Sequence, residues 1–290
     1  MPFRLQFNKI SSHSKMLSRI FTFVLLCLVV SRTVAVPPTF KIGPVPSGEL
    51  AVFKKQFTYY LNVFGIHLFG TAATPPAKLR HAAIILAEYL DNDEDGKPDN
   101  PKVLATMVQR KAFLFLTANE RALDTLDHDV FQDAGFHHGQ GQFATETNPG
   151  GNEFDASLEE VLHLVTHEGY AYAYPEVFGE IPGTTLANCL DRARGGHFKR
   201  VPRRYPKGAW FTYDDRTCDY GCQCTEYLYW AVTSVLGGQD TVRRRDDIGQ
   251  EWRLYNRELV EKGDPHVYKL ITDPKYKLPS RLPDGKYREK

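Results

Sequence analysis

Apolar residues recur every three or four positions along much of this chain, and that period is typical of helices that bury one face. Together with start and stop signals, the pattern predicts helices over 78–90, 101–109, 119–126, 156–168, 184–194, 223–236, 250–261 and 265–272. An apolar run over 112–117 predicts a strand, and a weaker strand pattern lies within 53–69. We therefore expect a mainly α fold, of the α+β class with few short strands.

The pattern is that of a single compact domain with irregular ends. Residues 36–77 form a Pro-rich N-terminal segment with a possible strand, and residues 274–290 form a tail without helical period. The globular, metal-binding part is expected over 78–273. Within it, the Gly-rich stretch 135–151 predicts a long loop ahead of the helix at 156–168, and long loops in compact domains are often functional.

Residues 1–35 have the pattern of a secretory signal peptide. Basic residues precede an apolar run over 20–30, and Thr33-Val34-Ala35 supplies small residues before a cut after Ala35. The run is too short for a transmembrane helix, and no later segment reaches the ~18 apolar residues that a span requires. We expect a secreted, extracellular protein without a membrane span.

Charge narrows the choice of partners. The chain has 36 Lys and Arg against 35 Asp and Glu, and five of the basic residues but no acidic residue lie in 1–35. The secreted form would therefore have 31 basic and 35 acidic residues, a formal charge of −4. Nucleic acid is an improbable partner for such a chain.

Cysteine usage agrees with an oxidising compartment. Cys27 leaves with the signal peptide, and Cys189, Cys218, Cys222 and Cys224 remain. Two disulfides with three possible connectivities are expected, and Cys189 must bond into the short stretch that holds the other three. A zinc site is the alternative, but the Cys-x3-Cys-x-Cys spacing differs from that of common zinc modules.

The most informative motif is the pair His163 and His167 within the helix at 156–168. Residues four apart lie on one helix face, so both imidazoles could reach one metal ion about 2.0–2.1 Å from each nitrogen. Glu160 lies one turn earlier on the same stripe, where it could be a ligand, a general base, or the partner of Ser157 in a capping box. Hydrogen-bonded structural histidines are the alternative.

This pair resembles the metal-binding helix of zincin metallopeptidases, which reads His-Glu-x-x-His. The resemblance implies zinc ligation, but Leu164 stands where that family has its general base and Thr166 where an inverted zincin has glutamate. Glu160 and His163 also match the Glu-x-x-His of di-iron and di-manganese carboxylate bundles. The chain contains no second such motif, so a mononuclear site is favoured.

A third ligand should come from another segment, and Glu226 is the first candidate. It lies in a largely apolar helix, where a buried carboxylate needs a partner such as a metal, an arginine or a tyrosine hydroxyl. His197 and Asp191 are competing candidates. If the site is catalytic, a metal-bound water would attack an amide or ester while Glu160 or Glu168 handles protons.

A second motif is the acidic loop that begins at Asp91. Asp91, Asp93, Asp95 and Asp99 surround Gly96 at positions 1, 3, 5 and 9, and the carbonyl of Lys97 falls at position 7. This spacing resembles the first half of an EF-hand calcium loop and, because Lys102 replaces the bidentate Glu at position 12, more closely a dockerin or thrombospondin type 3 loop. A structural calcium ion is expected, with an acidic solvated turn as the alternative.

Two functions from different classes therefore follow from the sequence. The first is a secreted metal-dependent hydrolase, possibly peptidase-like, with a zinc-type site and a structural calcium loop. The second is a non-enzymatic calcium-binding component of extracellular matrix or mineral, in which the histidine pair is structural. A histidine and carboxylate cluster with an opening to a cleft would favour the first.

Overall fold

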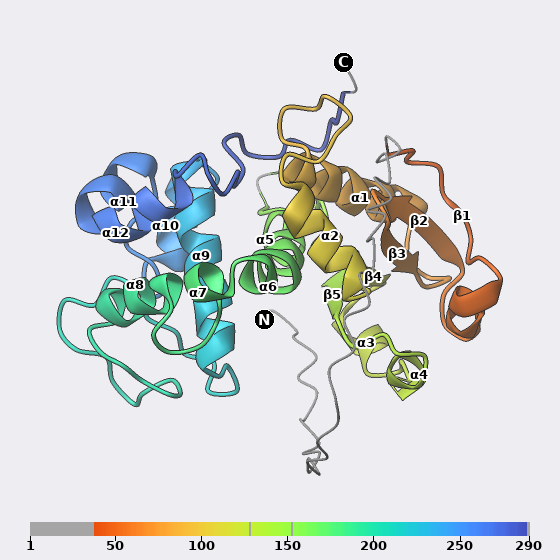
Figure 1. Cartoon of the computed structure of the whole chain (residues 1–290). Helices are drawn as coiled ribbons and strands as arrows, with labels where there is room; N and C mark the ends of the chain where they lie inside the picture. The colour runs from red at the N-terminus through yellow and green to blue at the C-terminus, as the bar shows by residue number, and fades with distance from the viewer. Residues whose placement is uncertain (1–37, 128, 152, 289–290) are drawn as a thin grey trace, which may run out of the picture.

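The computed structural model describes residues 38–127, 129–151 and 153–288 (Figure 1). The strands are β1 (Gly43–Pro44), β2 (Tyr59–Val63), β3 (Ile66–Gly70), β4 (Phe113–Thr117) and β5 (Gly139–Phe143). The helices of the first half are η1 (Gly48–Lys55, a 3-10 helix), α1 (Pro76–Leu90), α2 (Pro101–Gln109), α3 (Glu120–Leu123) and α4 (Asp129–Asp133). The expected signal peptide lies outside the described residues.

The second half is helical. It contains α5 (Ser157–Leu164), η2 (Val165–Tyr170, a π-helix), α6 (Ala171–Ala173), α7 (Pro175–Phe178), α8 (Thr185–Ala193), α9 (Tyr220–Val235), α10 (Val242–Ile248), α11 (Arg257–Gly263) and α12 (Pro265–Ile271). In Figure 1 these later helices, in green to blue, lie on one side of α5, and the sheet lies on the other. Helix α5 packs against α1, β5 and α9, so it joins the two halves.

The sheet has five strands in the order of the chain, from β1 to β5. Strand β2 pairs antiparallel with β1 and β3, whereas β4 pairs parallel with β3 and β5. The parallel pairs need crossovers, which α1 and α2 provide between β3 and β4. The fold is therefore α+β with a mixed sheet, and the expectation of a mainly α fold overstates its helical character.

Alternation along β4 places two different cores on the two faces of the sheet. Leu114 and Leu116 pack into the larger core with α1, α2 and α5. Phe113 and Phe115 point the other way, into a smaller core of phenylalanines. That core also contains Phe53, Phe57, Phe69, Phe131 and Phe136.

Strand β5 shows why a glycine-rich stretch forms a buried strand here. A Cβ atom on Gly139 would lie 2.4 Å from the ring of Phe113, and one on Gly141 would lie 3.0 Å from the ring of Phe115. Glycine therefore lets β5 pair closely beside β4. The alternate residues, Gln140 and Gln142, point toward α5. The long loop expected over 135–151 is interrupted by this strand.

Helix α9 forms the centre of the helical half and is buried along nearly its whole length. It contacts α5, α8, α11 and α12. The expected helix at 223–236 is confirmed, with its start at Tyr220 and Asp219 as its N-cap. The helix expected over 250–261 begins only at Arg257, because Trp252 pairs with Phe211 in an isolated β-bridge.

Of the two disulfides expected from the sequence, one is present among the described residues. Cys218 and Cys222 form a disulfide at the start of α9. Cys189 is a free thiol buried in α8, so the expectation that it bonds into the 218–224 stretch is wrong. Burial raises the pKa of the Cys189 thiol to about 11, which keeps it protonated and unreactive at neutral pH.

The C-terminal segment is irregular, as expected for 274–290, but it is well anchored. In Figure 1 it crosses from the blue helices to the loop between α1 and α2. Asn92 accepts hydrogen bonds from the backbone N–H groups of Ser280 and Arg281, both at 2.9 Å. Glu88 accepts bonds from the N–H groups of Gly285 and Lys286 at 3.0 and 3.1 Å. Within the described residues, no helix is long and apolar enough to cross a membrane.

Candidate metal centre

Helix α5 begins where Asp155 is fixed from two sides. Its Oδ2 lies 2.5 Å from His81 Nε2 on α1, and its Oδ1 accepts hydrogen bonds from the N–H groups of Asn148 and Ser157. Burial alone would raise the pKa of Asp155. The His81 hydrogen bond and the backbone N–H donors outweigh burial, so the pKa of Asp155 lies below its usual value. The start of α5, and so the position of the residues that follow, is tied to α1.

The helix changes its winding between the two histidines. From Val165 to Tyr170 the backbone is a π-helix, with hydrogen bonds to the fifth residue instead of the fourth. Gly169 lies inside this segment, where a Cβ atom would be 2.6 Å from Val103 on α2. A spacing of four residues therefore does not place His163 and His167 on one face.

His163 lies in a group with Glu226, which is also buried, and with Glu159, which is half-buried. One ligand atom from each of the three residues lies within 4.8 Å of the others. His163 and Glu226 each expose 3% of their surface, and their Nε2 and Oε2 atoms are 3.6 Å apart. The Nε2 of His163 has no hydrogen-bond partner among the described residues. A buried polar atom without a partner is costly, and a cation between these three side chains would remove that cost.

Glu160 lies on the other side of the imidazole. Its Oε2 is 3.8 Å from His163 Nδ1 and accepts a 2.6 Å hydrogen bond from Gln140 Nε2 on β5. Ala156 is the N-cap of α5, and Ser157 bonds to Gln142, so the capping box is not formed. A carboxylate that holds the second nitrogen of a metal-binding histidine is the usual outer-shell arrangement in zinc sites.

The charges in this group are coupled. Burial raises the pKa of Glu226 to about 8, and the neighbouring Glu159, Glu160 and Glu251 raise it as well, whereas His163 lowers it. Burial alone would lower the pKa of His163, but the charges of Glu226 and Glu160 raise it to about 9. Without a metal, the pair of His163 and Glu226 therefore binds protons more tightly than the free side chains do.

His167 belongs to a different polar group. Its Nδ1 lies 2.6 Å from Glu180 Oε2, and its Nε2 lies 3.3 Å from Glu168 Oε1. Glu168 also accepts a 2.8 Å hydrogen bond from Arg110 Nε and lies 3.2 Å from His138 Nδ1. Burial alone would raise the pKa of Glu168. Its contacts with His138, His167 and Arg110 outweigh burial, so the pKa of Glu168 lies below its usual value. The ion pairs hold Glu168 as an anion.

The competing third ligands are placed elsewhere. His197 Nδ1 lies 2.9 Å from Asp191 Oδ2, and Asp191 also accepts a 2.7 Å hydrogen bond from Arg194. Neither residue joins the Glu159, His163 and Glu226 group. Of the sequence candidates, the structure brings together His163, Glu226 and Glu160, and it separates them from His167 and Glu168.

Glu159 is the ligand candidate that the sequence analysis missed. It precedes His163 by four residues, within the regular part of the helix, and that spacing places the two side chains on one face. The same rule applied to His163 and His167 failed because the π-helix begins between them. The Glu159-x3-His163 spacing was therefore an available signal.

The acidic loop after α1 forms a second group of possible cation ligands. Side-chain oxygens of Asp91, Asp93 and Asp95 lie within 4.8 Å of one another. Gly96, with φ of 85°, permits the turn, and its N–H donates to Asp91 Oδ2 at 2.9 Å. Asp99 Oδ2 accepts a 2.6 Å hydrogen bond from the Asn92 N–H. The structure therefore brings together three of the expected ligands, Asp91, Asp93 and Asp95.

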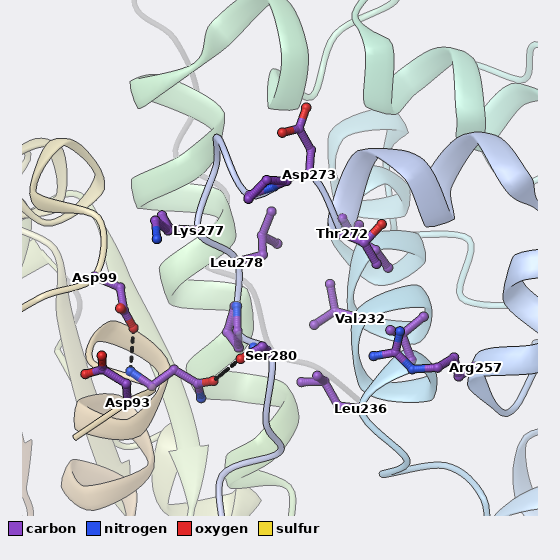
Figure 2. A pocket seen from close by; sticks show the side chains of 15 residues that line it. Asp93, Asp99, Val232, Leu236, Arg257, Thr272, Asp273, Lys277, Leu278 and Ser280 are labelled. Atoms are coloured by element: carbon purple, nitrogen blue, oxygen red, sulfur yellow. Dashed lines mark hydrogen bonds between the residues drawn. The ribbon is translucent and has the colours of Figure 1, made fainter. Parts of the chain in front are cut away.

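The C-terminal segment contacts this acidic loop directly. The Tyr287 hydroxyl donates to Asp91 Oδ2, and the Arg288 N–H donates to Glu94 Oε2 at 3.1 Å. Figure 2 shows Asp93 and Asp99 at one side of a cavity of about 440 Å³, with Leu278 and Ser280 of the same segment beside them. Burial raises the pKa values of Asp91 and Asp99, and the neighbouring carboxyl groups raise both values as well.

Comparison with known proteins yields no match to a family model, to a curated protein or to a solved structure. The geometry of these two groups is therefore the basis on which a function can be proposed.

Proposed function

We propose that this protein is a secreted metal-dependent hydrolase whose divalent transition metal, with zinc as our expectation, is held by Glu159, His163 and Glu226. The observation that supports this most strongly is the buried Nε2 of His163, which has no hydrogen-bond partner in the described part of the chain and lies 3.6 Å from Glu226 Oε2. Three protein ligands with one open position are typical of catalytic zinc sites, whereas structural sites use four.

In this proposal the metal supplies Lewis-acid activation of water and of a carbonyl group. One water is consumed: its hydroxyl adds to the carbonyl carbon, the bond to nitrogen or oxygen breaks, and the proton goes to the leaving group. Glu160 orients His163 through Nδ1.

The same proposal assigns a structural calcium ion to the loop from Asp91 to Asp99. The close approach of Asp91, Asp93 and Asp95 supports it, since like charges at such distances repel unless a cation or protons neutralise them. The C-terminal segment packed on the loop is what a structural ion would hold in place.

Metal analysis of the purified secreted protein tests the proposal. We expect about one transition metal per chain in the wild type after dialysis against calcium-free buffer, and none in His163→Ala. The matched control is His167→Ala, the same substitution four residues away, which should keep the metal because His167 lies in the other polar group.

Two results would contradict the proposed site. Equal metal loss in both variants would mean that the histidines act together after all. Calcium alone, unchanged by either substitution, would favour the non-enzymatic calcium-binding protein of extracellular matrix or mineral.

A further inference from the structure

A cavity of about 690 Å³ lies between residues 201–216 and 250–253. Its size lies within the range of about 300–1,000 Å³ that is typical of ligand pockets. Backbone hydrogen bonds hold its two walls together, because the Thr212 N–H donates to the Glu251 carbonyl at 2.8 Å and the Arg253 N–H donates to the Trp210 carbonyl at 3.1 Å. The cavity is therefore framed by paired backbone.

The lining of this cavity is strongly basic. Five cationic side chains border it: Arg203, Arg204, Lys207, Arg216 and Arg253. All five residues are exposed, and no ion pair is found for them in the described part of the chain. Asp214 and Glu251 are the acidic residues of the lining. The excess of positive charge is notable in a protein whose expected secreted form is acidic.

The inner wall of the cavity packs on α9, the helix that carries Glu226. Tyr213 and Glu251 line the cavity, and the neighbouring Phe211 and Trp252 pack on Tyr227 of that helix with ring centroids 5.6 and 6.0 Å apart. Burial raises the pKa of the Tyr213 hydroxyl, and the charges of Glu226 and Glu159 raise it further.

We infer that this cavity binds peptides with acidic side chains and that such peptides are the substrates of the proposed hydrolase. This inference rests on the proposed function. Four of the five cations are arginines, whose planar guanidinium groups pair with carboxylates through two parallel hydrogen bonds. Asp214 and Glu251 offer acceptors for the N–H groups of a peptide backbone, which inorganic phosphate lacks.

Binding of labelled hexapeptides tests the inference without depending on catalysis. Fluorescence anisotropy of a hexaglutamate probe is measured on the metal-free full-length secreted protein at low ionic strength, with hexaglutamine as the neutral counterpart. We expect hexaglutamate to bind at least about tenfold more tightly than hexaglutamine, and Arg204→Gln/Arg253→Gln to weaken it by a similar factor.

The control variant, Arg80→Gln/Arg121→Gln, removes the same charge from exposed residues of α1 and α3 and should bind like the wild type. Equal affinity for the two peptides, or equal loss in both double variants, would overturn the inference. So would binding of labelled chondroitin sulfate without hexaglutamate binding, which would indicate a polysaccharide site. Because metal content is measured separately, loss of the proposed metal site and loss of peptide binding are distinguishable.

Discussion

The carboxylates of the acidic loop and those of the group around His163 differ in the partners that they contact. In the loop from Asp91 to Asp99, the acceptors are occupied by backbone N–H groups of the same turn and by the C-terminal segment. In the buried group, Glu159 and His163 come from α5 and Glu226 comes from α9, and the Nε2 of His163 is left without a hydrogen bond within the described residues.

This difference separates a local motif from a tertiary site. A loop of nine residues can arrange its own oxygens, and a cation adds stability to a shape that already exists. The buried group exists only when two helices pack, and its charges must be compensated by protons or by a metal. We therefore expect the buried group to respond more strongly than the loop to any change of charge.

Removal of one carboxylate from each group should give the largest contrast. Glu226→Gln should reduce the transition metal to background, because it removes a ligand from a three-residue site. Asp93→Asn, which also removes one negative charge, should leave that metal unchanged. Mass spectrometric metal analysis of both variants measures this, and retention of the metal by Glu226→Gln would exclude Glu226 as a ligand.

Loss of the hydrogen bond that holds Glu160 beside His163 should have the next largest effect on metal binding. Gln140→Leu removes the 2.6 Å hydrogen bond to Glu160 and should weaken metal affinity by about 10–100-fold, the usual cost of losing an outer-shell partner. Gln142→Leu, on the same strand and face, should change affinity much less, since Gln142 bonds to Ser157 and Thr147. Competition with a chelating dye measures both affinities; equal values would refute the role given to Glu160.

The pH dependence of stability should distinguish the metal-free and metal-bound forms. The pKa of Glu226 rises from 4.5 to about 8 and that of His163 from 6.5 to about 9. Groups with raised pKa values stabilise the fold below their unfolded-state pKa and lose that contribution as the pH rises through the folded-state pKa. The metal-free protein should therefore lose stability between about pH 5 and pH 9.

Thermal unfolding across that range checks this prediction. We expect the melting temperature of the metal-free protein to fall by about 5 °C or more, which corresponds to a few kcal/mol at this chain length. Saturating metal should remove the decrease, because metal binding displaces the protons. A melting temperature of the metal-free form that rises with pH would contradict the proton occupancy of the buried group.

Calcium should have the smallest effect. The loop lacks a glutamate at position 12, so millimolar calcium should stabilise the fold by only about 1 kcal/mol, or about 2–4 °C in melting temperature. Asp93→Asn/Asp95→Asn should abolish this shift, whereas Glu120→Gln/Glu176→Gln, at exposed positions elsewhere, should preserve it. An identical calcium shift in both variants would indicate that calcium binds elsewhere.

Much of the fold followed from local pattern. Helices α1, α2, α8, α9 and α12 lie within a few residues of their expected bounds, because apolar period and caps are local properties. Strand β5 was missed because its glycines lack an apolar pattern, and the reason for them is the rings of Phe113 and Phe115. The free Cys189 was missed because thiol pairing depends on distances that the sequence does not contain.

The sequence by itself determined the helix around His163, the candidacy of Glu226 and the grouping of Asp91, Asp93 and Asp95, since these depend on local pattern along the chain. Only the tertiary structure decided which residues share the proposed metal site. The π-helix after Leu164 turns His167 toward Glu180, and the packing of α9 on α5 brings Glu226 to His163 and Glu159. Both outcomes depend on how helices pack against one another, and such contacts join residues far apart in the sequence.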